Sequence, residues 1–156
     1  MAVPSPEPVE AVPRIAPAGG LHPERLGHAE RARLALEILA AYVQARRALR
    51  RNPIATVVAE LRSESASAAP AAAQSLYEAR RLGRAVGRLL AHLPGDTRCL
   101  ARSLVLTRLL ASRGIEAKLV LGARTAPEFL AHAWVEYDGK PVLDPGEESF
   151  GRLVEL

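Results

Sequence analysis

The chain has 156 residues, the size of one ordinary domain with room for one core and one principal site. Hydrophobic residues make up 49% and charged residues 24%, a balance that excludes disorder of the whole chain and a membrane-embedded protein. The formal net charge is +4, and a single cysteine, Cys99, excludes an internal disulfide and a cysteine-rich zinc site. Any chemistry at Cys99 is therefore that of a thiol.

The positive charge is unevenly distributed along the chain. Residues 1–98 hold fourteen arginines against nine acids, whereas residues 99–156 hold seven basic residues against eight acids. Aromatic residues are only 4% of the chain and none is interleaved with arginine, which argues against nucleic-acid binding by base stacking. A cluster in the first part forms the solvated end of a helix or a surface for a protein or peptide partner. Its members are Arg46, Arg47, Arg50 and Arg51.

The first 23 residues are rich in proline and contain no apolar core of the kind that a secretory signal requires. The longest apolar stretch, residues 34–43, is about half of the ~20 residues that span a bilayer. We therefore predict a flexible Pro-rich lead over residues 1–23, a single domain over residues 24–156 and no membrane span. The expected location is the cytoplasm.

Helical periodicity dominates the first part of the domain, residues 24–93. The predicted helices run from residue 31 to the break at Asn52-Pro53, over residues 54–61, and over residues 76–93. Asn52 is placed to cap the second helix, and a Ser/Ala-rich connection of uncertain state covers residues 63–73. Gly83 and Gly87 lie one turn apart in the third helix. They either let another helix approach closely or are tolerated surface glycines.

The pattern changes in residues 94–156. Asp96 or Thr97 is placed to cap a fourth helix that ends at Gly114, and Cys99 lies in its first turn. Alternating or apolar runs then predict three strands, and Asp138-Gly139 is typical of a hairpin. These strands cover residues 115–121, 131–137 and 141–144. The predicted fold is α+β, with N-terminal helices followed by a nucleophile-bearing helix packed on a small antiparallel sheet.

Three residues of this second part carry groups that can act together in nucleophilic catalysis. At Cys99 the unsatisfied N–H groups and positive dipole of a helix start favour the thiolate, and Arg98 adds positive potential. His132 lies in a strand between small residues, and Asp144 ends the last predicted strand. Singly, these are most simply a buried thiol, a strand histidine and a turn residue. Together they supply a nucleophile, a base and a carboxylate that orients the base.

The turn at Asp138-Gly139 decides whether His132 and Asp144 can meet. A two-residue loop places them on opposite faces of the sheet, whereas a three-residue loop with Gly139 left-handed sets them directly opposite each other. We therefore predict an odd-length loop or a bulge. If the loop has two residues and no bulge, Asp138 or Glu136 becomes the candidate orienter.

Other candidate groups are weaker. No pair among His22, His28 and His92 has metal-ligand spacing with a suitable acid, and no glycine loop of the phosphate-binding kind is present. We therefore expect neither a metal nor a cofactor. Trp134 is expected to pack against a helix, with the lining of the cleft as the alternative, and Ser103 to donate to a backbone carbonyl.

Several of these segments resemble the transglutaminase-like cysteine-protease superfamily and, more narrowly, the leader peptidases of lasso-peptide biosynthesis. The segments are Cys99 to Leu104, Arg113 to Ile115, Ala131 to Glu136 and Asp144-Pro145. The resemblance implies a papain/transglutaminase-like core with Cys99 as nucleophile, His132 as general base and then acid, and Asp144 as its orienter. It also implies a hydrolase of peptide maturation, which cuts the leader from a ribosomally made precursor peptide through a thioester that water hydrolyses.

Many such peptidases work with a small β-rich domain that grips the leader. Residues 1–90 show helical periodicity and almost no strand pattern, so the resemblance implies the stand-alone form, which works with a separate leader-recognition protein. The lasso cyclase is a further candidate partner. Three alternatives stay open: a transglutaminase-like acyl transferase or amidase, a non-catalytic partner-binding module, and a basic helical nucleic-acid binder.

Overall fold

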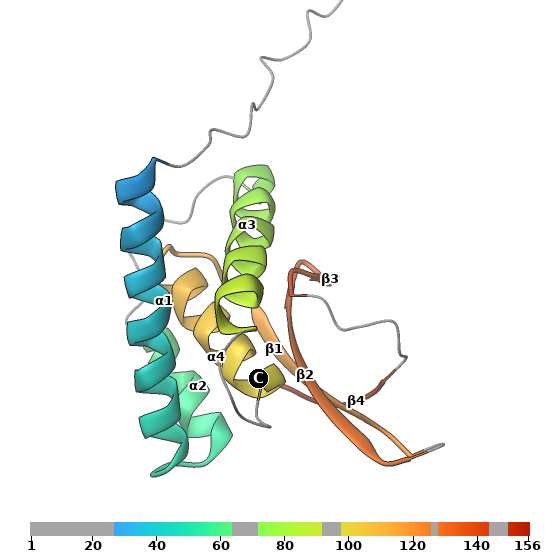
Figure 1. Ribbon diagram of the computed structural model, residues 1–156. Coiled ribbons are helices and arrows are strands. Elements are labelled where there is room, and N and C mark those ends of the chain that lie inside the picture. Colours follow the sequence, from blue (N-terminus) through green and yellow to red (C-terminus); the bar gives the residue numbers. More distant parts are fainter. Residues whose placement is uncertain (1–26, 64–71, 92–97, 126–127, 144–149) are drawn as a thin grey trace, which may run out of the picture.

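A computed structural model describes residues 27–63, 72–91, 98–125, 128–143 and 150–156, and every structural statement refers to these ranges. Helices come first and strands last, so the predicted α+β class is confirmed (Figure 1). The helices are α1 (His28–Leu49), α2 (Ile54–Ser63), α3 (Ala72–Leu90) and α4 (Arg98–Ala111). The strands are β1 (Lys118–Arg124), β2 (Leu130–Tyr137), β3 (Lys140–Pro141) and β4 (Gly151–Glu155).

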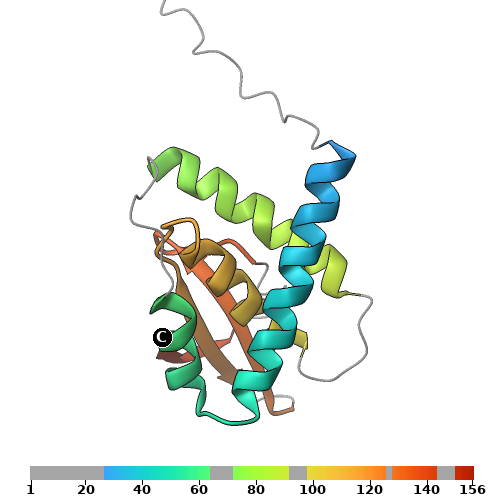
Figure 2. The same ribbon diagram turned by 90° about the vertical axis from the view of Figure 1, so that its left-hand side faces the viewer.

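Helix α4 is the centre of the fold. It contacts α1, α2 and α3 on one side and the strands β1 and β2 on the other, so the helix predicted to bear the nucleophile lies between the outer helices and the sheet. Figures 1 and 2 show this layering, with α1 outermost. Leu104, Leu106 and Leu110 of α4 are completely buried because they are enclosed from both sides. Burial of this kind stabilises the fold by about 2 kcal/mol for each leucine side chain.

The helix boundaries follow the predicted ones with small shifts. Helix α1 begins three residues earlier than expected, at His28, where the Glu30 carboxylate accepts the Gly27 N–H at 3.0 Å. Helix α2 begins after Pro53, whose carbonyl accepts the Val57 N–H. The position before the helix is therefore Pro53, so the cap predicted at Asn52 is displaced by one residue, and the Asn52 side-chain amide donates to Glu60 at 3.4 Å.

The end of α4 matches the prediction at Gly114. This residue has a φ of 70°, and the next N–H, of Ile115, donates back to Leu110 at 2.9 Å. A left-handed glycine after a helix permits this reversed hydrogen bond at little cost. Strand β1 begins at Lys118, three residues later than predicted, because Ile115 and Ala117 join the helical core first.

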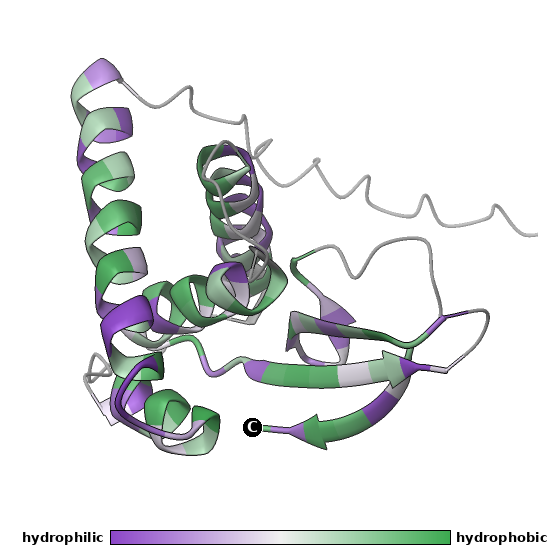
Figure 3. Cartoon of the chain, turned by 60° about the horizontal axis from the view of Figure 1, so that its bottom comes forward, coloured by the Kyte–Doolittle hydropathy of each residue, from purple (hydrophilic) through white to green (hydrophobic). Residues whose placement is uncertain are grey.

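The sheet has the strand order β3-β2-β1-β4, and all its pairs are antiparallel. The edge strand β4 was not predicted. Its five residues are all exposed, and they include a glycine and two charged side chains, so they lack the half-buried alternation that indicates a strand. Figure 3 shows the contrast with β1, which is largely hydrophobic along its length.

Register assigns each strand residue to one of two faces. Leu119 lies opposite Val135, and both belong to the core that the helices cover. Side chains alternate along a strand, so the next pair, Val120 and Trp134, lies on the other face. His132, which pairs with Gly122, lies on that face as well. By this alternation, His132 belongs to the face opposite the core that contains Leu119 and Val135.

The hairpin between β2 and β3 corrects the predicted loop length. Tyr137 pairs with Lys140, and Asp138 and Gly139 have φ angles of 50° and 68°, so the turn has two residues. The three-residue loop is wrong because both turn residues adopt the left-handed conformation that closes a tight hairpin.

An irregularity follows one step beyond the hairpin. The N–H groups of Val142 and Leu143 both donate to the carbonyl of Val135, at 2.9 and 3.5 Å. Both donors lie beyond the end of β3, outside the paired residues of the hairpin. The bulge predicted at Gly139 is therefore wrong, like the three-residue loop.

Helix α3 approaches the same segment closely. A Cβ on Gly83 would lie 2.0 Å from the Val142 carbonyl oxygen, whereas a Cβ on Gly87 would have no heavy atom within 4 Å. Gly83 therefore permits a close approach, as one interpretation predicted, although the partner is the backbone of the segment after β3 and not a helix. Gly87 leaves open space.

Some predictions fall outside the described residues. They are the lead over residues 1–23, most of the connection over residues 63–73, the helix stop at Pro94-Gly95, the cap at Asp96 or Thr97, and Asp144. Within the described part of the chain, no helix is both long and apolar enough to cross a membrane.

Candidate active site

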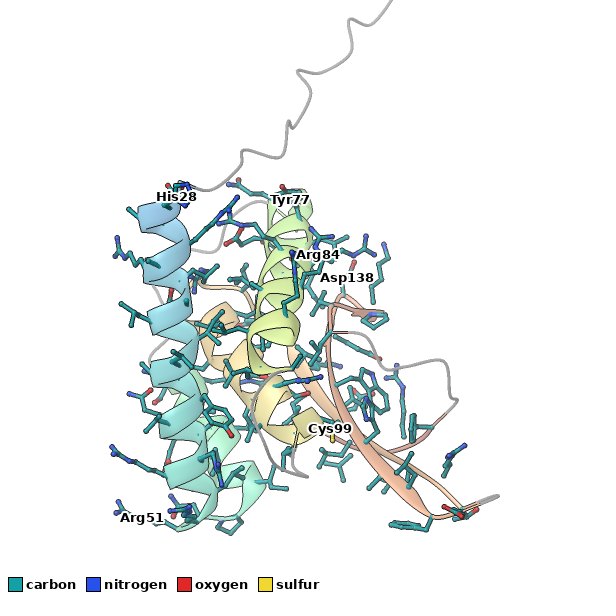
Figure 4. All side chains as sticks on the ribbon, in the orientation of Figure 1. His28, Arg51, Tyr77, Arg84, Cys99 and Asp138 are labelled. Atoms are coloured by element: carbon teal, nitrogen blue, oxygen red, sulfur yellow. The ribbon has the colours of Figure 1, made fainter. Side chains whose placement is uncertain are left out.

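Cys99 is the second residue of α4 (Figure 4). The first N–H groups of a helix have no acceptor within it, and the backbone N–H of Cys99 is one of them. Its side chain is half-buried and packs against the edge of the core, and it is the free thiol of the chain. The thiol is thus held on the central helix of the fold while one side stays accessible.

A pocket of about 480 Å³ contains both Cys99 and His132 among its lining residues. It lies where α3, α4, β2 and the segment after β3 meet. Its other lining residues are Gly83, Arg84, Gly87, Arg88, Arg102, Ala133, Val142 and Leu143. The structure therefore brings the two residues with the predicted nucleophile and base, thirty-three positions apart, to one site.

The imidazole of His132 packs beside two aromatic rings that also contact each other. Its ring centroid lies 5.0 Å from that of Phe150 with an interplanar angle of 20°, and 6.2 Å from that of Trp134 with an angle of 19°. Cys99 Sγ makes no hydrogen bond within the described residues. Catalytic hydrogen bonds often tighten only when substrate binds, so this thiol needs none in the free protein. The pocket that Cys99 and His132 share is therefore the observation that joins them.

Trp134 has a different environment from the one predicted. Its ring lies over Gly122, where a Cβ would come within 2.8 Å of it, and against Phe150, on the face of the sheet opposite the helical core. Its indole Nε1–H donates to Glu136 Oε1 at 2.7 Å. The expected packing against a helix is therefore wrong, and Trp134 instead supports the imidazole.

Glu136 anchors this aromatic group to the edge strand. Its carboxylate is buried and accepts two hydrogen bonds from Arg152 of β4, at 2.7 and 3.0 Å. Arg152 also donates to Glu155, which accepts a further hydrogen bond from Lys118. The hydrogen bonds from Lys118 and Arg152 hold the pKa of Glu155 below its usual value, and those to Glu155 and Glu136 raise the pKa of Arg152.

A second contact fixes α4 against β2. The Ser103 hydroxyl donates to the Ala133 carbonyl at 3.0 Å, and both residues are buried. Ser103 lies one turn after Cys99, and Ala133 follows His132. The predicted donation to a backbone carbonyl is confirmed, and it ties the helix of the thiol to the strand of the imidazole.

Asp144 lies outside the described residues, so the geometry of the third predicted group is not described. The two substitutes considered for it have other places. Glu136 is engaged by Trp134 and Arg152, and Asp138 is an exposed residue of the hairpin turn. Neither is positioned as an orienter of His132 by its described contacts.

Sequence reasoning missed Phe150 and Arg152, because the strand that carries Arg152 has no hydrophobic alternation. It also missed the arginines of the pocket, which look like ordinary solvated helix residues. In the described part of the chain, no group of three His, Cys, Asp or Glu residues is arranged to hold a metal ion. His28 lies at the start of α1, and His22 and His92 lie outside the described residues.

The profile of the transglutaminase-like superfamily matches residues 39–155. The chain belongs to this superfamily. It is also 50% identical to the microcin J25-processing protein McjB of Escherichia coli over 46 residues, which are 30% of this chain and 22% of McjB. The match therefore spans less than a quarter of that relative. No solved structure matches the chain.

Proposed function

We propose that this protein is a cysteine peptidase that removes the leader from a lasso-peptide precursor. The observation that carries the proposal is the pocket that Cys99 and His132 share, because it joins a helix-start thiol to an imidazole in a transglutaminase-like chain. The name of McjB, a microcin-processing protein, supports peptide maturation over other chemistries of the superfamily. The reaction would take place in the cytoplasm, where the precursor is made.

In the first half of the reaction, His132 takes the proton of Cys99, and the thiolate attacks the carbonyl carbon of the last leader residue. The oxyanion that forms accepts a hydrogen bond from the Cys99 N–H, which α4 leaves without an internal acceptor. The C–N bond then breaks, and protonated His132 gives its proton to the amine of the core peptide. The leader remains on Cys99 as a thioester.

In the second half, His132 removes a proton from water, and the resulting hydroxide attacks the thioester carbonyl. The C–S bond breaks, the leader leaves with a new carboxyl group, and the proton returns to the thiol. Packed beside Phe150 and Trp134, His132 keeps one orientation through both proton transfers. A fixed orientation lowers the entropic part of each barrier.

Asp144 is the proposed orienter of His132. The regular register of the hairpin would direct residue 144 to the helix-covered face of the sheet, away from His132. The assignment therefore rests on the resemblance of Asp144-Pro145 to the motif of the superfamily, and not on the register of the hairpin. A carboxylate there would fix the imidazole tautomer and stabilise the imidazolium.

The proposed partner is a separate leader-recognition protein, which would dock on the outer face of α1. Leu36, Leu39 and Val43 lie along one side of this helix and are 68%, 39% and 44% exposed. Four exposed arginines lie in the last turn of this helix and just after it, at residues 46, 47, 50 and 51. An apolar strip that ends in cations fits a partner surface whose apolar centre is bordered by carboxylates.

The experiment is cleavage of a precursor peptide in the presence of its recognition protein, followed by mass spectrometry. Wild type should release intact leader and core, and Cys99→Ala should release neither. Cleavage by Cys99→Ala would overturn the proposal. Transfer of the leader to an added amine in place of water would favour the acyl-transferase alternative. Reversal of the charges of the four arginines at the end of α1 tests the docking face, and loss of recognition-protein binding would support it.

A further inference from the structure

Three arginines line the pocket of Cys99, and their arrangement follows from helix geometry. Arg84 and Arg88 are one turn apart on α3, and Arg102 lies one turn after Cys99 on α4. Figure 4 shows Arg84 on α3 and Cys99 at the start of α4, both beside the strands. Between Arg84 and Arg88, Gly87 contributes no side chain, and a Cβ there would meet only open space. Two helices thus place arginine side chains on the lining of one pocket.

The charge balance of this pocket differs from that of its neighbours. A second pocket is lined by Arg62, Lys118 and Arg152 together with four acids, and a third by three arginines together with Glu30 and Glu37. Among the described residues, the Cys99 pocket has three arginines and no carboxylate. No acidic side chain among its described lining residues therefore balances the positive charge of these arginines.

The same contrast holds for individual arginines. Arg81, Arg113 and Arg152 each form an ion pair with a glutamate. Within the described residues, Arg84, Arg88 and Arg102 form none, and Arg88 donates only to the carbonyl of Arg84. Arg102 Nε is buried and has no hydrogen-bond acceptor in the described part of the chain. A buried donor of this kind is costly unless a ligand supplies its acceptor.

We propose that Arg84, Arg88 and Arg102 bind a carboxylate of the substrate, so that the peptide attacked by Cys99 carries an Asp or Glu close to the scissile bond. The guanidinium fork matches a carboxylate, with two parallel hydrogen bonds. A pocket of about 480 Å³ is about 8 Å across, the length of two to three extended residues, so the acidic residue lies within about two positions of the bond that is cut.

The walls of the pocket favour a peptide over a nucleic acid. Ala133, Val142 and Leu143 are apolar, and they suit the backbone and small side chains of an extended chain. Apart from His132, the described lining has no aromatic ring on which a base could stack. This inference rests on the proposed function for its substrate, but the anion site itself can be tested without any substrate.

The test compares the rates at which iodoacetate and iodoacetamide alkylate Cys99 in the intact protein. The two reagents are nearly the same size and differ in that one carries a carboxylate. Because Cys99 is the single cysteine of the chain, mass spectrometry reports this thiol alone. The intrinsic reactivity of the thiolate cancels in the ratio of the two rates, which therefore measures recognition of the carboxylate.

The iodoacetate-to-iodoacetamide rate ratio of wild type should exceed that of N-acetylcysteine amide by about tenfold in dilute buffer. Adding 0.5 M salt should reduce this excess. Arg84→Gln and Arg88→Gln should each lower the ratio about threefold, as should Arg102→Gln. Arg80→Gln removes an exposed arginine of α3 outside the pocket and should leave the ratio unchanged. Because Arg84 and Arg88 are exposed, their variants keep the core intact.

A wild-type ratio equal to that of the free thiol, or one that the pocket variants do not change, would overturn the anion site even if Cys99 cleaves a precursor. A raised ratio in a protein that cleaves no precursor would support the anion site and count against the peptidase. Protection of Cys99 by the peptide Ala-Glu-Ala-Gly, but not by Ala-Gln-Ala-Gly, would support an acidic peptide as ligand. Protection by oligodeoxythymidine alone would overturn the choice of peptide.

Discussion

Gly83 and Val142 approach so closely that a side chain at residue 83 would occupy the space of the Val142 carbonyl, 2.0 Å from its oxygen. This contact joins α3 to the segment that leads from β3 toward Asp144. It also forms part of the wall of the Cys99 pocket. The absence of a side chain at this position is thus a structural requirement of the candidate site.

Gly83→Ala should therefore destabilise the protein by about 3 kcal/mol, because the overlap is with backbone and one of two packed elements must move. Gly87→Ala is the matched control one turn away. It meets open space and should leave stability unchanged or raise it by up to about 1 kcal/mol, the gain expected from replacing a helical glycine. Urea unfolding measures both, and equal stability of the two variants would contradict the close approach.

Gly122→Ala should displace the indole of Trp134, since the new Cβ would lie 2.8 Å from the ring and 2.9 Å from the Gly151 carbonyl oxygen. Trp134 is the single tryptophan, so its fluorescence reports this change directly. We expect red-shifted emission and faster quenching by acrylamide, with Gly87→Ala as control. An unchanged spectrum would mean that Trp134 does not lie over Gly122.

Arg152→Met should destabilise the protein, because it leaves the buried Glu136 carboxylate with the indole N–H and without its cation. The loss should be smaller than for a fully buried pair, since the Arg152 side chain is 50% exposed. The double variant with Glu136→Gln should recover part of the loss. Lys118→Met, which removes an exposed partner of Glu155, should have little effect on urea unfolding. Equal losses of stability from Arg152→Met and Lys118→Met would contradict a special role for Glu136.

The lowered pKa of Glu155 predicts a pH-dependent contribution to stability. Its folded pKa lies below the ordinary value of 4.5, because Lys118 and Arg152 donate to the carboxylate. The folded state therefore gains stability above the ordinary pKa and loses it as the pH falls through the folded pKa. The stability difference between wild type and Glu155→Gln should be present at neutral pH and vanish on acidification. It should also shrink at high salt, since the group is exposed. A difference that persists in acid would contradict this assignment.

Much of the fold follows from local patterns in the sequence. The periodicity of α1, α2 and α4 and the left-handed Gly114 are short-range features, and each was predicted within a few residues. The edge strand β4 was missed because its pairing with β1 is a long-range contact that leaves all five of its residues exposed. Nothing in the local sequence of Gly151–Glu155 indicates that partner.

The candidate site was only partly predictable for a related reason. Cys99 and His132 belong to recognisable segments, a helix start and an alternating strand. The rings and charges around them come from elsewhere: Phe150 precedes β4, and Arg84 lies on α3. The hydrogen bonds that Val142 and Leu143 both donate to Val135 depend on how the chain leaves the hairpin, which turn propensities at Asp138-Gly139 do not determine.

The most direct test of the proposed chemistry is to look for the thioester on Cys99. Wild-type protein is mixed with precursor and recognition protein, quenched in acid after a short time, and analysed intact by mass spectrometry. We expect an adduct with the mass of the leader acyl group, located on Cys99, removed by hydroxylamine and absent from Cys99→Ser. Leader release with no such adduct, or an adduct on another residue, would contradict the proposed chemistry.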